Sequence, residues 1–351
     1  MLGRRSFIRS ISIATPIVAM GGLTMCAADA GRGGEYDTLI SKARNAMLAM
    51  QRASWEQGSA IQAMIECEDY EMLRLMVNEA ILRQSRDGRT CMLGSDHNVT
   101  DPVASGYGIL KAYEIFGEAK YKIAADRLYD YCKNKAPRDS AGAVYHLNDS
   151  KQLWSDSIYM LPPFLAAYKD YDECMKQLRG YRARLLQPAK RLYSHRWSDD
   201  EDRFLSDKCW GGGNGWAAAA FAIIYELLPA DMDGYRKEVA SYLTELLDGL
   251  ISNMRTDGLF HDIVDDTQSY VETNLSQMAA FAIYKSVRTG AIDKVYLEAA
   301  GKMKDGALSK VDEYGYVQGA AGSPYFNAPG TSTEAQAFLL MMLAEEKKIT
   351  I

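Results

Sequence analysis

The stretch TDGLFHDI (residues 256–263) joins two apolar helical patterns through a glycine turn and a short aromatic segment. Comparable glycine or acidic turns occur at RDGRTCML (86–93), SAGAVYHL (140–147), SDDEDRFL (198–205) and DEYGYVQG (312–319). Successive turns lie 54, 58, 58 and 57 residues apart. A nearly fixed period of this length indicates a repeated structural unit, here one helical hairpin with a long loop.

Helical patterns fill the chain between these turns. Apolar residues recur at spacings of three and four, as in YRKEVASYLTELLDGLI (235–251), whereas alternating runs of Val, Ile and Thr are nearly absent. About twelve helices are expected, near residues 37–50, 54–67, 71–84, 103–116, 119–133, 156–169, 171–187, 214–228, 233–253, 273–288, 292–304 and 331–345.

Hairpins that cannot bury their apolar faces alone stack on their neighbours. The predicted fold is therefore all-α, an (α/α)6 barrel (six-hairpin toroid), with an open helical solenoid as the alternative. The loops all fall on the same side of the hairpins, so we expect them to build a cleft at one end of the ring.

The first 30 residues are predicted to be an export signal. GRRSFIR (3–9) carries paired arginines, the apolar run 11–25 is too short and too glycine-rich for a good membrane span, and ADA (28–30) supplies a cleavage site. We expect an exported, periplasmic protein without stable membrane insertion, in which residues 31–351 form one domain. LTMC (23–26) allows the alternative that Cys26 carries a lipid.

Several classes of function are disfavoured by composition. The net charge is −6 and no basic stripe alternates with aromatic residues, so nucleic-acid binding is not expected. The cysteines beyond residue 30 form no CxxC pair, and His97, His146 and His261 do not have metal-ligand spacing. We therefore predict neither a metal nor a cofactor.

LWSDSIYMLPPF (153–164) places Asp156 among bulky apolar groups. The carboxyl is either a helix N-cap or an acid kept for chemistry. Trp154, two residues earlier, favours the acid, because an indole wall desolvates a carboxylate and raises its pKa. Asp101, followed by Pro102, opens another helix and has the same two interpretations.

HRWSDDEDRFLSDKCWGGGNGW (195–216) is the other unusual segment. Three consecutive glycines, Gly211 to Gly213, bring backbone close to a neighbouring helix or a ligand. The segment has neither the preceding strand nor the Lys-Ser/Thr pair of a phosphate loop. His195, beside Trp197, is either a loop histidine with ordinary partners or a functional one.

These segments resemble glycoside hydrolase families 105 and 88, the unsaturated uronyl hydrolases. LWSDSIYMLPPFLAAY, HRW and WGGGNGW are similar to the motifs W-x-D-x-x-Y-M-x-x-P-F-L, H-x-W and W-x-R-G-N-G-W. Further similar segments follow in the family's order along essentially the whole chain after residue 30, among them ASWEQGSAIQAMIE, YVETNLSQMAAFAIYKSVRTG and GSPYFNAPGTSTEAQAFLLMM.

The resemblance implies an (α/α)6 barrel that removes a 4,5-unsaturated uronic acid from oligosaccharides released by polysaccharide lyases. It implies that Asp156 is the acid/base that protonates the C4=C5 enol ether, and that Asp101 is an assisting second acid. It places His195 near the unsaturated ring, with substrate-binding or supporting roles for the residues of the matched motifs, Trp154, Tyr159, Trp210, Asn214 and Trp216.

One position departs from the family pattern: the arginine of R-G-N-G-W is Gly212 here. Glycine cannot replace the forked contact of a guanidinium with a carboxylate. Either Arg196, Arg203 or Lys208 supplies the cation, or the carboxylate is recognised otherwise, or the substrate is not an ordinary unsaturated uronide.

Three alternatives stay open. A sugar epimerase of this fold needs several catalytic histidines, and the four here are scattered. A mannanase needs adjacent aspartates, which SDD (198–200) and VDD (264–266) supply in plain turns. A non-catalytic glycan-binding protein is the third alternative, favoured by the missing arginine.

Overall fold

The computed structural model describes residues 27–92 and 96–350. Apart from residues 27–30, the predicted export signal lies outside them, and so does Cys26. The chain divides into two compact units, residues 1–38 and 39–351, and the larger unit contains the predicted turns and site residues.

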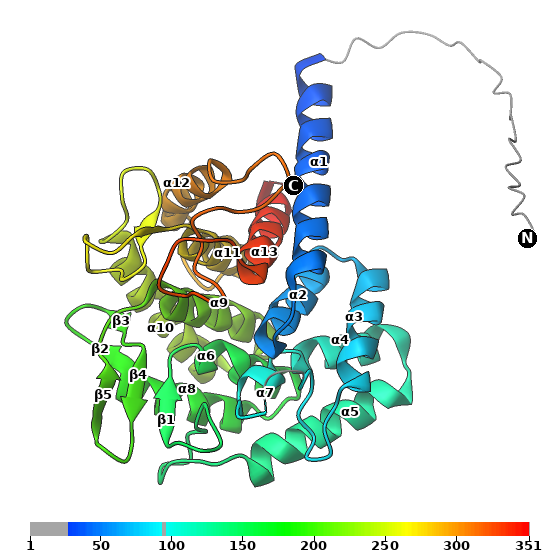
Figure 1. Cartoon of the computed structure of the whole chain (residues 1–351), viewed down its shortest axis with the longest axis vertical. Coiled ribbons are helices and arrows are strands. Elements are labelled where there is room, and N and C mark those ends of the chain that lie inside the picture. The colour runs from blue at the N-terminus through cyan, green and yellow to red at the C-terminus, as the bar shows by residue number, and fades with distance from the viewer. Residues whose placement is uncertain (1–26, 93–95, 351) are drawn as a thin grey trace, which may run out of the picture. The chain divides into compact units, whose positions relative to one another are not determined.

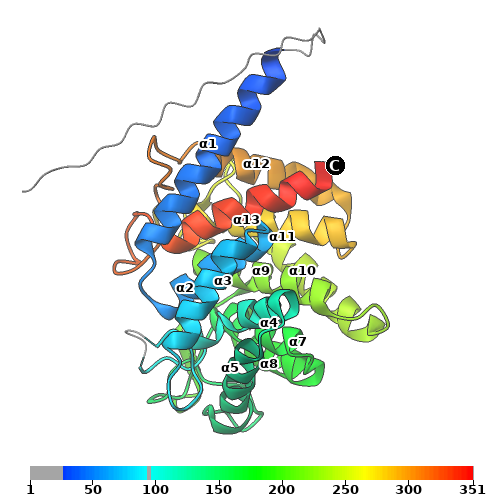
Figure 2. The ribbon, with the colours of Figure 1, turned by 90° about the vertical axis from the view of Figure 1, so that its right-hand side faces the viewer.

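An inner ring of helices forms the core of the larger unit. Its helices are α2 (Ser54–Glu66), α4 (Gly106–Phe116), the pair α6 (Ser157–Met160) and α7 (Pro162–Ala167), α9 (Gly211–Leu227), α11 (Asn274–Thr289) and α13 (Thr333–Thr350). Each contacts the next along the chain, and α13 returns to contact α2, which closes the ring. Figures 1 and 2 show α9, α11 and α13 side by side.

Outer helices alternate with the inner ones along the chain. They are α3 (Tyr70–Leu82), α5 (Ala119–Asp130), α8 (Tyr171–Leu185), α10 (Asp233–Ile251), α12 (Leu297–Leu308) and the part of α1 (Ala27–Met50) from residue 39 onward. The outer helices bury one face only. In α3 this face is Leu73, Met76, Val77 and Ala80, at spacings of three and four. Each of the twelve predicted helical segments overlaps a helix of the structure.

The helix predicted for residues 156–169 is broken into α6 and α7. The break lies at Leu161, immediately before Pro162 and Pro163. Proline has no backbone N–H to donate and starts a helix better than it continues one. Short irregular helices also occur at Asp101–Val103 (η1), Tyr131–Lys135 (η2) and Lys294–Tyr296 (η3).

Each of the repeated turns contains a residue with positive φ. Gly88, Gly142, Gly258 and Gly315 all have positive φ, between 79° and 114°, and the acidic turn has Asp202 at φ 46°. A Cβ atom at Gly258 would lie 2.0 Å from a backbone oxygen of α12. A glycine is therefore needed both for the backbone angle and for the close approach to the outer helix.

Short strands lie in the loops. An antiparallel sheet joins β1 (Gln152–Trp154), β4 (Arg196–Ser198) and β5 (Arg203–Ser206). Two smaller ribbons pair β2 (Leu186–Gln187) with β3 (Leu192–Tyr193), and β6 (Phe260–His261) with β7 (Val271–Glu272). The sequence did not predict them, because strands of two to four residues are too short to show an alternating pattern.

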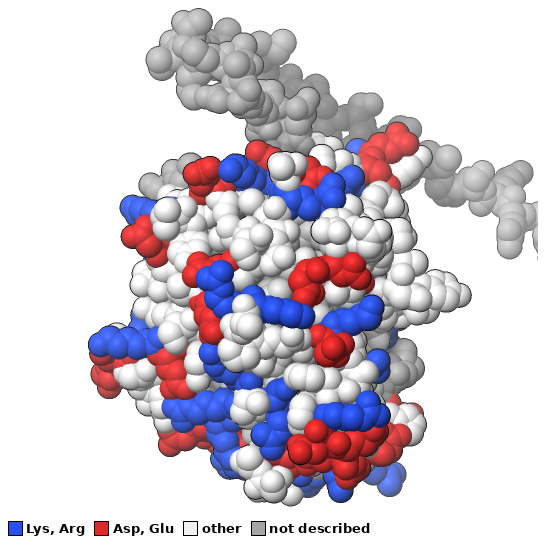
Figure 3. Space-filling model, turned by 90° about the vertical axis from the view of Figure 1, so that its left-hand side faces the viewer, with Lys and Arg blue, Asp and Glu red and all other residues white. Residues whose placement is uncertain are grey.

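Charged side chains on the face shown in Figure 3 are interspersed by sign rather than gathered into one large patch. Many of the surface charges pair with a neighbour, as Arg179 does with Glu238 at 2.6 Å. In residues 27–92 and 96–350, no helix has both the length and the apolar character needed to cross a bilayer.

A buried ion cluster lies where the inner helices end. Nζ of Lys285 (α11) lies 3.1 Å from Glu66 (α2), 2.5 Å from Glu226 (α9) and 3.4 Å from Glu345 (α13). Burial opposes the charge of Lys285, but the three carboxylates outweigh it and raise its pKa. The ammonium group therefore stays charged and ties the C-terminal ends of these helices together.

Replacing Lys285 with methionine should destabilise the protein by about 3 kcal/mol, because the partner carboxylates would lose their most buried cation and keep only the more exposed Arg288 and Lys348. Urea unfolding followed by circular dichroism measures this. Lys302→Met, which removes an exposed pair with Glu298, is the control and should cost at most about 1 kcal/mol. Equal effects of the two substitutions would contradict a structural role for the cluster.

Candidate active site

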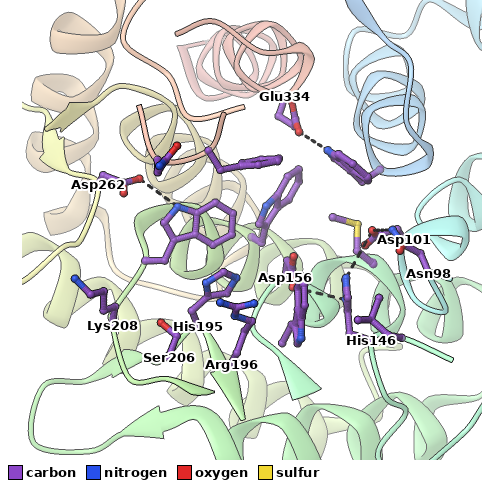
Figure 4. Close-up of a pocket in the computed structure, with 18 of the residues that line it drawn as sticks. Asn98, Asp101, His146, Asp156, His195, Arg196, Ser206, Lys208, Asp262 and Glu334 are labelled. Carbon is purple, nitrogen blue, oxygen red and sulfur yellow. Dashed lines mark hydrogen bonds and ion pairs between the residues drawn. The ribbon is translucent and has the colours of Figure 1, made fainter. Parts of the chain in front are cut away.

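A cavity of about 470 Å³ opens where the inner helices begin (Figure 4). Trp55 is the second residue of α2, Asp156 caps α6, Trp210 precedes α9 and Glu334 is the second residue of α13. Asp101 begins η1, ahead of α4. Because a helix N-terminus carries a partial positive charge, this end of the ring favours an anionic ligand.

The small sheet aligns the predicted acid with its neighbours. Trp154 of β1 pairs with Arg196 of β4, and the N–H of Ser155 donates to the carbonyl of His195 at 3.0 Å. The register changes between Arg196 and Trp197, where β4 meets β5. Two loops that belong to different repeats thus place Asp156, His195 and Arg196 along one wall of the cavity.

Asp156 is both a helix cap and a candidate acid. Its Oδ1 accepts a hydrogen bond from the N–H of Ser157 at 3.1 Å, and its side chain is 15% exposed. Burial raises the pKa of Asp156 to about 7, although backbone N–H groups and Arg196 act in the opposite direction. A carboxyl group with this pKa is about half protonated at neutral pH and able to donate a proton.

His146 lies between the two predicted acids. Its ring stacks on Trp154, with centroids 4.1 Å apart and an interplanar angle of 8°. Nε2 lies 3.7 Å from Asp101 Oδ2, and Nδ1 lies 3.8 Å from Asp156 Oδ1. Burial lowers the pKa of His146, so the ring is neutral near pH 7 and these contacts are not ion pairs.

Asp101 is more deeply buried than Asp156, with 6% of its side chain exposed. Asn98 donates a hydrogen bond to its Oδ2. Burial raises the pKa of Asp101 to about 6; His146 works against this rise and Asp156 adds to it. The two carboxyls therefore interact electrostatically, and a negative charge on one raises the pKa of the other.

His195 lies between two indoles. Its ring centroid is 4.8 Å from that of Trp210 and 5.7 Å from that of Trp154. Burial, helped by Arg196, lowers its pKa to about 3. His195 thus presents a neutral imidazole to the cavity, suited to hydrogen bonding without charge.

Arg196 and Lys208 line the cavity, whereas Arg203 does not. Arg203 is largely exposed and pairs with Glu201. The guanidinium carbon of Arg196 lies 5.2 Å from the ring centroid of Trp154, and its buried Nε has no hydrogen-bond partner among the described residues. Of the cations that the sequence offered in place of the missing arginine, Arg196 lies closest along the wall to Asp156 (Figure 4).

The model of Glycosyl Hydrolase Family 88 matches residues 36–349 of this chain. The chain belongs to this family. It is 28% identical over 228 residues to the unsaturated rhamnogalacturonyl hydrolase YesR of Bacillus subtilis, covering 61% of this chain and 64% of the relative. It is 24% identical over 192 residues to the unsaturated 3S-rhamnoglycuronyl hydrolase of Formosa agariphila, covering 49% and 51%. The chain thus spans less than two thirds of the length of either curated relative.

The crystal structure of a possible member of the GH105 family from Salmonella enterica serovar Paratyphi A superposes with a TM-score of 0.80. It is 18% identical, and the match covers 95% of this chain and 97% of that one. The predicted all-α, six-hairpin fold and the predicted family are therefore confirmed, and the open solenoid is excluded.

The Trp210 indole lies against Gly212, the position at which the motif W-x-R-G-N-G-W has an arginine. A Cβ atom at Gly212 would lie 2.4 Å from Cζ2 of the Trp210 indole. The indole is held there by its Nε1–H, which donates to Asp262 Oδ1 at 3.2 Å. An arginine at position 212 has no room while Trp210 keeps this position.

Gly213 lets α9 touch the segment that carries Asp156. A Cβ atom at Gly213 would lie 2.0 Å from Oγ and 2.9 Å from Cβ of Ser155. The glycine run is therefore explained by close packing between helix and loop. No ligand contact is needed to account for it.

Two of the predicted substrate-binding residues do not line the cavity. Asn214 is buried, and its amide bonds the backbone N–H and C=O of Tyr193 and the C=O of Trp210. Tyr159 is buried behind Trp216, with ring centroids 4.6 Å apart. Neither side chain lines the cavity in this structure, and both pack behind its wall, so the structure gives them a supporting position.

The other predicted residues do line the cavity: Asp101, Trp154, Asp156, His195, Trp210 and Trp216. Sequence reasoning missed His146 and the wall formed by Trp55, Asp262, Phe326 and Glu334. One indication of this wall was present in the sequence: TSTEAQ (331–336) places an acidic residue, Glu334, at the start of the last predicted helix.

The paired aspartates of the mannanase alternative lie outside the cavity. Asp199 accepts a hydrogen bond from Tyr145, Asp200 pairs with Lys151, and Asp265 pairs with Lys190. No group of three or more His, Cys, Asp or Glu side chains in the described part of the chain has an arrangement that could hold a metal ion.

Replacing Gly213 with alanine should destabilise the protein by about 1–3 kcal/mol, because the methyl group would collide with Ser155. Gly301→Ala, on α12 with nothing within 4 Å of the added Cβ, is the control and should stabilise by up to about 1 kcal/mol. Thermal unfolding of both variants tests this. Two variants of equal stability would show that α9 does not need this close contact.

Proposed function

We propose that this chain removes a 4,5-unsaturated uronic acid from the non-reducing end of an oligosaccharide by hydrating its enol ether. One observation carries the proposal: Asp156, a half-buried carboxyl with a pKa of about 7, lies beside Arg196 in an aromatic cavity. A single protonated acid is suited to protonating a carbon atom. Ordinary glycoside hydrolysis requires two carboxylates on opposite sides of the scissile bond.

The proposed reaction begins with transfer of the Asp156 proton to C4 of the substrate. The resulting cation is shared by C5 and the ring oxygen, and water adds at C5 while its proton returns to Asp156. The C5–ring oxygen bond of this hemiketal then breaks, which leaves a ketone at C5 and a hemiacetal at C1. The hemiacetal releases the leaving sugar as an alcohol and becomes an aldehyde, so one water is consumed overall.

Asp101 and His146 support this cycle because they set the electrostatic environment of Asp156. The neutral His146 ring lies between the two carboxyls and covers one face of the Trp154 indole. Because a charge on Asp101 raises the pKa of Asp156, the pair favours a protonated acid at the start of the reaction. His195 is placed to bond a substrate hydroxyl or the attacking water.

We further propose that Arg196, assisted by Lys208 at the more exposed side of the cavity, binds the uronate carboxylate. The unpartnered Nε of Arg196 supports this assignment. We also propose that a polysaccharide lyase supplies the substrate, because a lyase leaves the C4=C5 bond. The paired arginines of the predicted export signal support a site of action outside the cytoplasm.

The central test follows the loss of near-ultraviolet absorbance of unsaturated uronyl disaccharides. Replacing Asp156 with asparagine should lower kcat by about 10²–10⁴-fold, because asparagine cannot donate the proton. Asp200→Asn, an exposed residue outside the cavity, is the matched control and should keep full activity. Absence of turnover by a folded wild-type protein on every disaccharide, with binding retained, would instead favour a glycan-binding protein.

The activity should depend on pH through the proton of Asp156. Its raised pKa keeps the carboxyl protonated up to about pH 7. Above this value kcat/KM should fall about tenfold for each pH unit, since only the protonated form reacts. A pH–rate profile of the wild-type protein measures this, and an activity that rises between pH 7 and 9 would exclude Asp156 as the proton donor.

Replacing Arg196 with glutamine should raise KM about 10–100-fold, the size expected for losing a charged hydrogen bond to a carboxylate. The kcat value should change less, because the carboxylate is bound in both ground and transition states. Arg203→Gln, which alters an exposed arginine outside the cavity, is the control. An unchanged KM for Arg196→Gln would transfer the carboxylate-binding role to Lys208.

A further inference from the structure

Glu334 is a buried carboxyl that the proposed mechanism does not use. It is 3% exposed, yet it lines the cavity. Trp55 Nε1–H donates to its Oε1 at 2.5 Å, whereas its Oε2 is buried without a hydrogen-bond partner among the described residues. A buried carboxyl oxygen without a partner costs free energy unless a ligand group satisfies it.

Arg196 lies beside Asp156, while Glu334 lies across the opening from both (Figure 4). Burial raises the pKa of Asp262, and Lys208 lies close enough to act in the opposite direction, so the charge of Asp262 is partly offset by a cation. Oδ1 of Asp262 accepts hydrogen bonds from Trp210 and Tyr270. The uronate carboxylate therefore has a favourable position on the Arg196 wall and an unfavourable one on the Glu334 wall.

This charge separation fixes how the substrate ring lies, given the function proposed above. The uronate carboxylate is attached to C5, and the carbon that Asp156 protonates is its neighbour C4, so both atoms lie toward the Asp156 and Arg196 wall. C1 is the ring atom farthest from C4 in a six-membered ring. The leaving sugar on C1 is therefore directed away from Asp156, toward Glu334.

We propose that Glu334 determines which leaving sugar the cavity accepts, by bonding a hydroxyl of that sugar through Oε2 and repelling sugars with a sulfate or carboxylate there. This inference rests on the proposed function and adds the class of leaving sugar to it: neutral and hydroxylated. The aromatic groups next to Glu334 fit the same ligand, because Phe326 lies 6.4 Å from Trp55 and 6.1 Å from Trp210, measured between ring centroids. Aromatic faces pack against the C–H faces of neutral sugars.

The test compares kcat/KM for three substrates at pH 8, where Glu334 is ionised because burial raises its pKa only to about 7. The substrates carry the same unsaturated uronate linked to a neutral deoxyhexose, to its sulfate ester, or to a methyl group. The wild-type protein should prefer the neutral sugar to the sulfated one by up to about tenfold, since about a tenth of Glu334 is uncharged one pH unit above its pKa and still accepts the sulfated sugar.

Glu334→Gln should raise kcat/KM for the sulfated substrate about tenfold and change the value for the neutral substrate less than about threefold. The amide keeps an acceptor for Trp55 and a bonding group for the sugar, but it has no charge. The methyl glycoside has no leaving sugar, so its kcat/KM should be the same in both proteins. Glu298→Gln, an exposed site on α12, controls for the change in net charge.

Three results would overturn this inference while leaving the proposed function intact. They are a wild-type protein that accepts the sulfated sugar as well as the neutral one, a preference unchanged in folded Glu334→Gln, and a change in kcat/KM for the methyl glycoside as large as that for the sulfated substrate. The first needs no variant, so the inference is testable even if Glu334→Gln does not fold. Failure of the wild-type protein to react with any of the three substrates would refute the proposed function instead.

Discussion

The common direction of the inner helices is the constraint on which the site depends. When α13 closes against α2, the helix starts meet at one end of the ring and the helix ends meet at the other. The starting end gathers unsatisfied N–H groups and partial positive charge, which suits a cavity for an anion. The other end gathers partial negative charge, and there the chain places Lys285 and Arg288 among buried carboxylates. One topological fact thus accounts for both the cavity and the ion cluster.

Position, rather than an unusual pKa alone, distinguishes Asp156 from other buried acids of this protein. Glu272 also has a pKa raised to about 7 by burial. Its oxygens, however, accept hydrogen bonds from the N–H groups of Asn274, Leu275 and Ala321, and it does not line the cavity. Glu272 is a structural carboxyl that ties two loops to α11. Asp156 accepts one backbone hydrogen bond as the N-cap of α6, and its side chain lines the cavity. Its carboxyl proton can therefore be transferred to a ligand bound there.

The sequence predicted what is encoded within short continuous segments. Apolar spacing located the helices, the glycine turns gave the repeat, and the motif around Asp156 gave a carboxyl that lines the cavity. Residues brought together only by closing the ring were not predictable in this way. Trp55 and Glu334 bond each other across 279 positions of the chain. The stacking of His146 on Trp154 likewise depends on how two loops fold over each other, and the spacing of residues along the sequence does not predict this arrangement. The motif also did not reveal that the Asn214 side chain bonds backbone groups behind the cavity wall, because the same motif contains residues that pack α9 and residues that line the cavity.

The missing arginine at position 212 is best understood together with Trp210. A side chain at position 212 and the observed position of the indole exclude each other, so Trp210 would have to move to admit the arginine that the motif W-x-R-G-N-G-W has beside its tryptophan. With its Nε1–H on Asp262, the indole covers the start of α9, packs against His195 and faces Phe326. With glycine at position 212, the positive charge of the cavity comes from Arg196 and Lys208. Lys208 partly offsets the charge of Asp262, whereas Glu334 lies across the opening from Arg196 (Figure 4). The glycine at position 212 therefore agrees with the substrate orientation proposed above, in which the carboxylate lies against Arg196 and the leaving sugar against Trp210, Phe326 and Glu334.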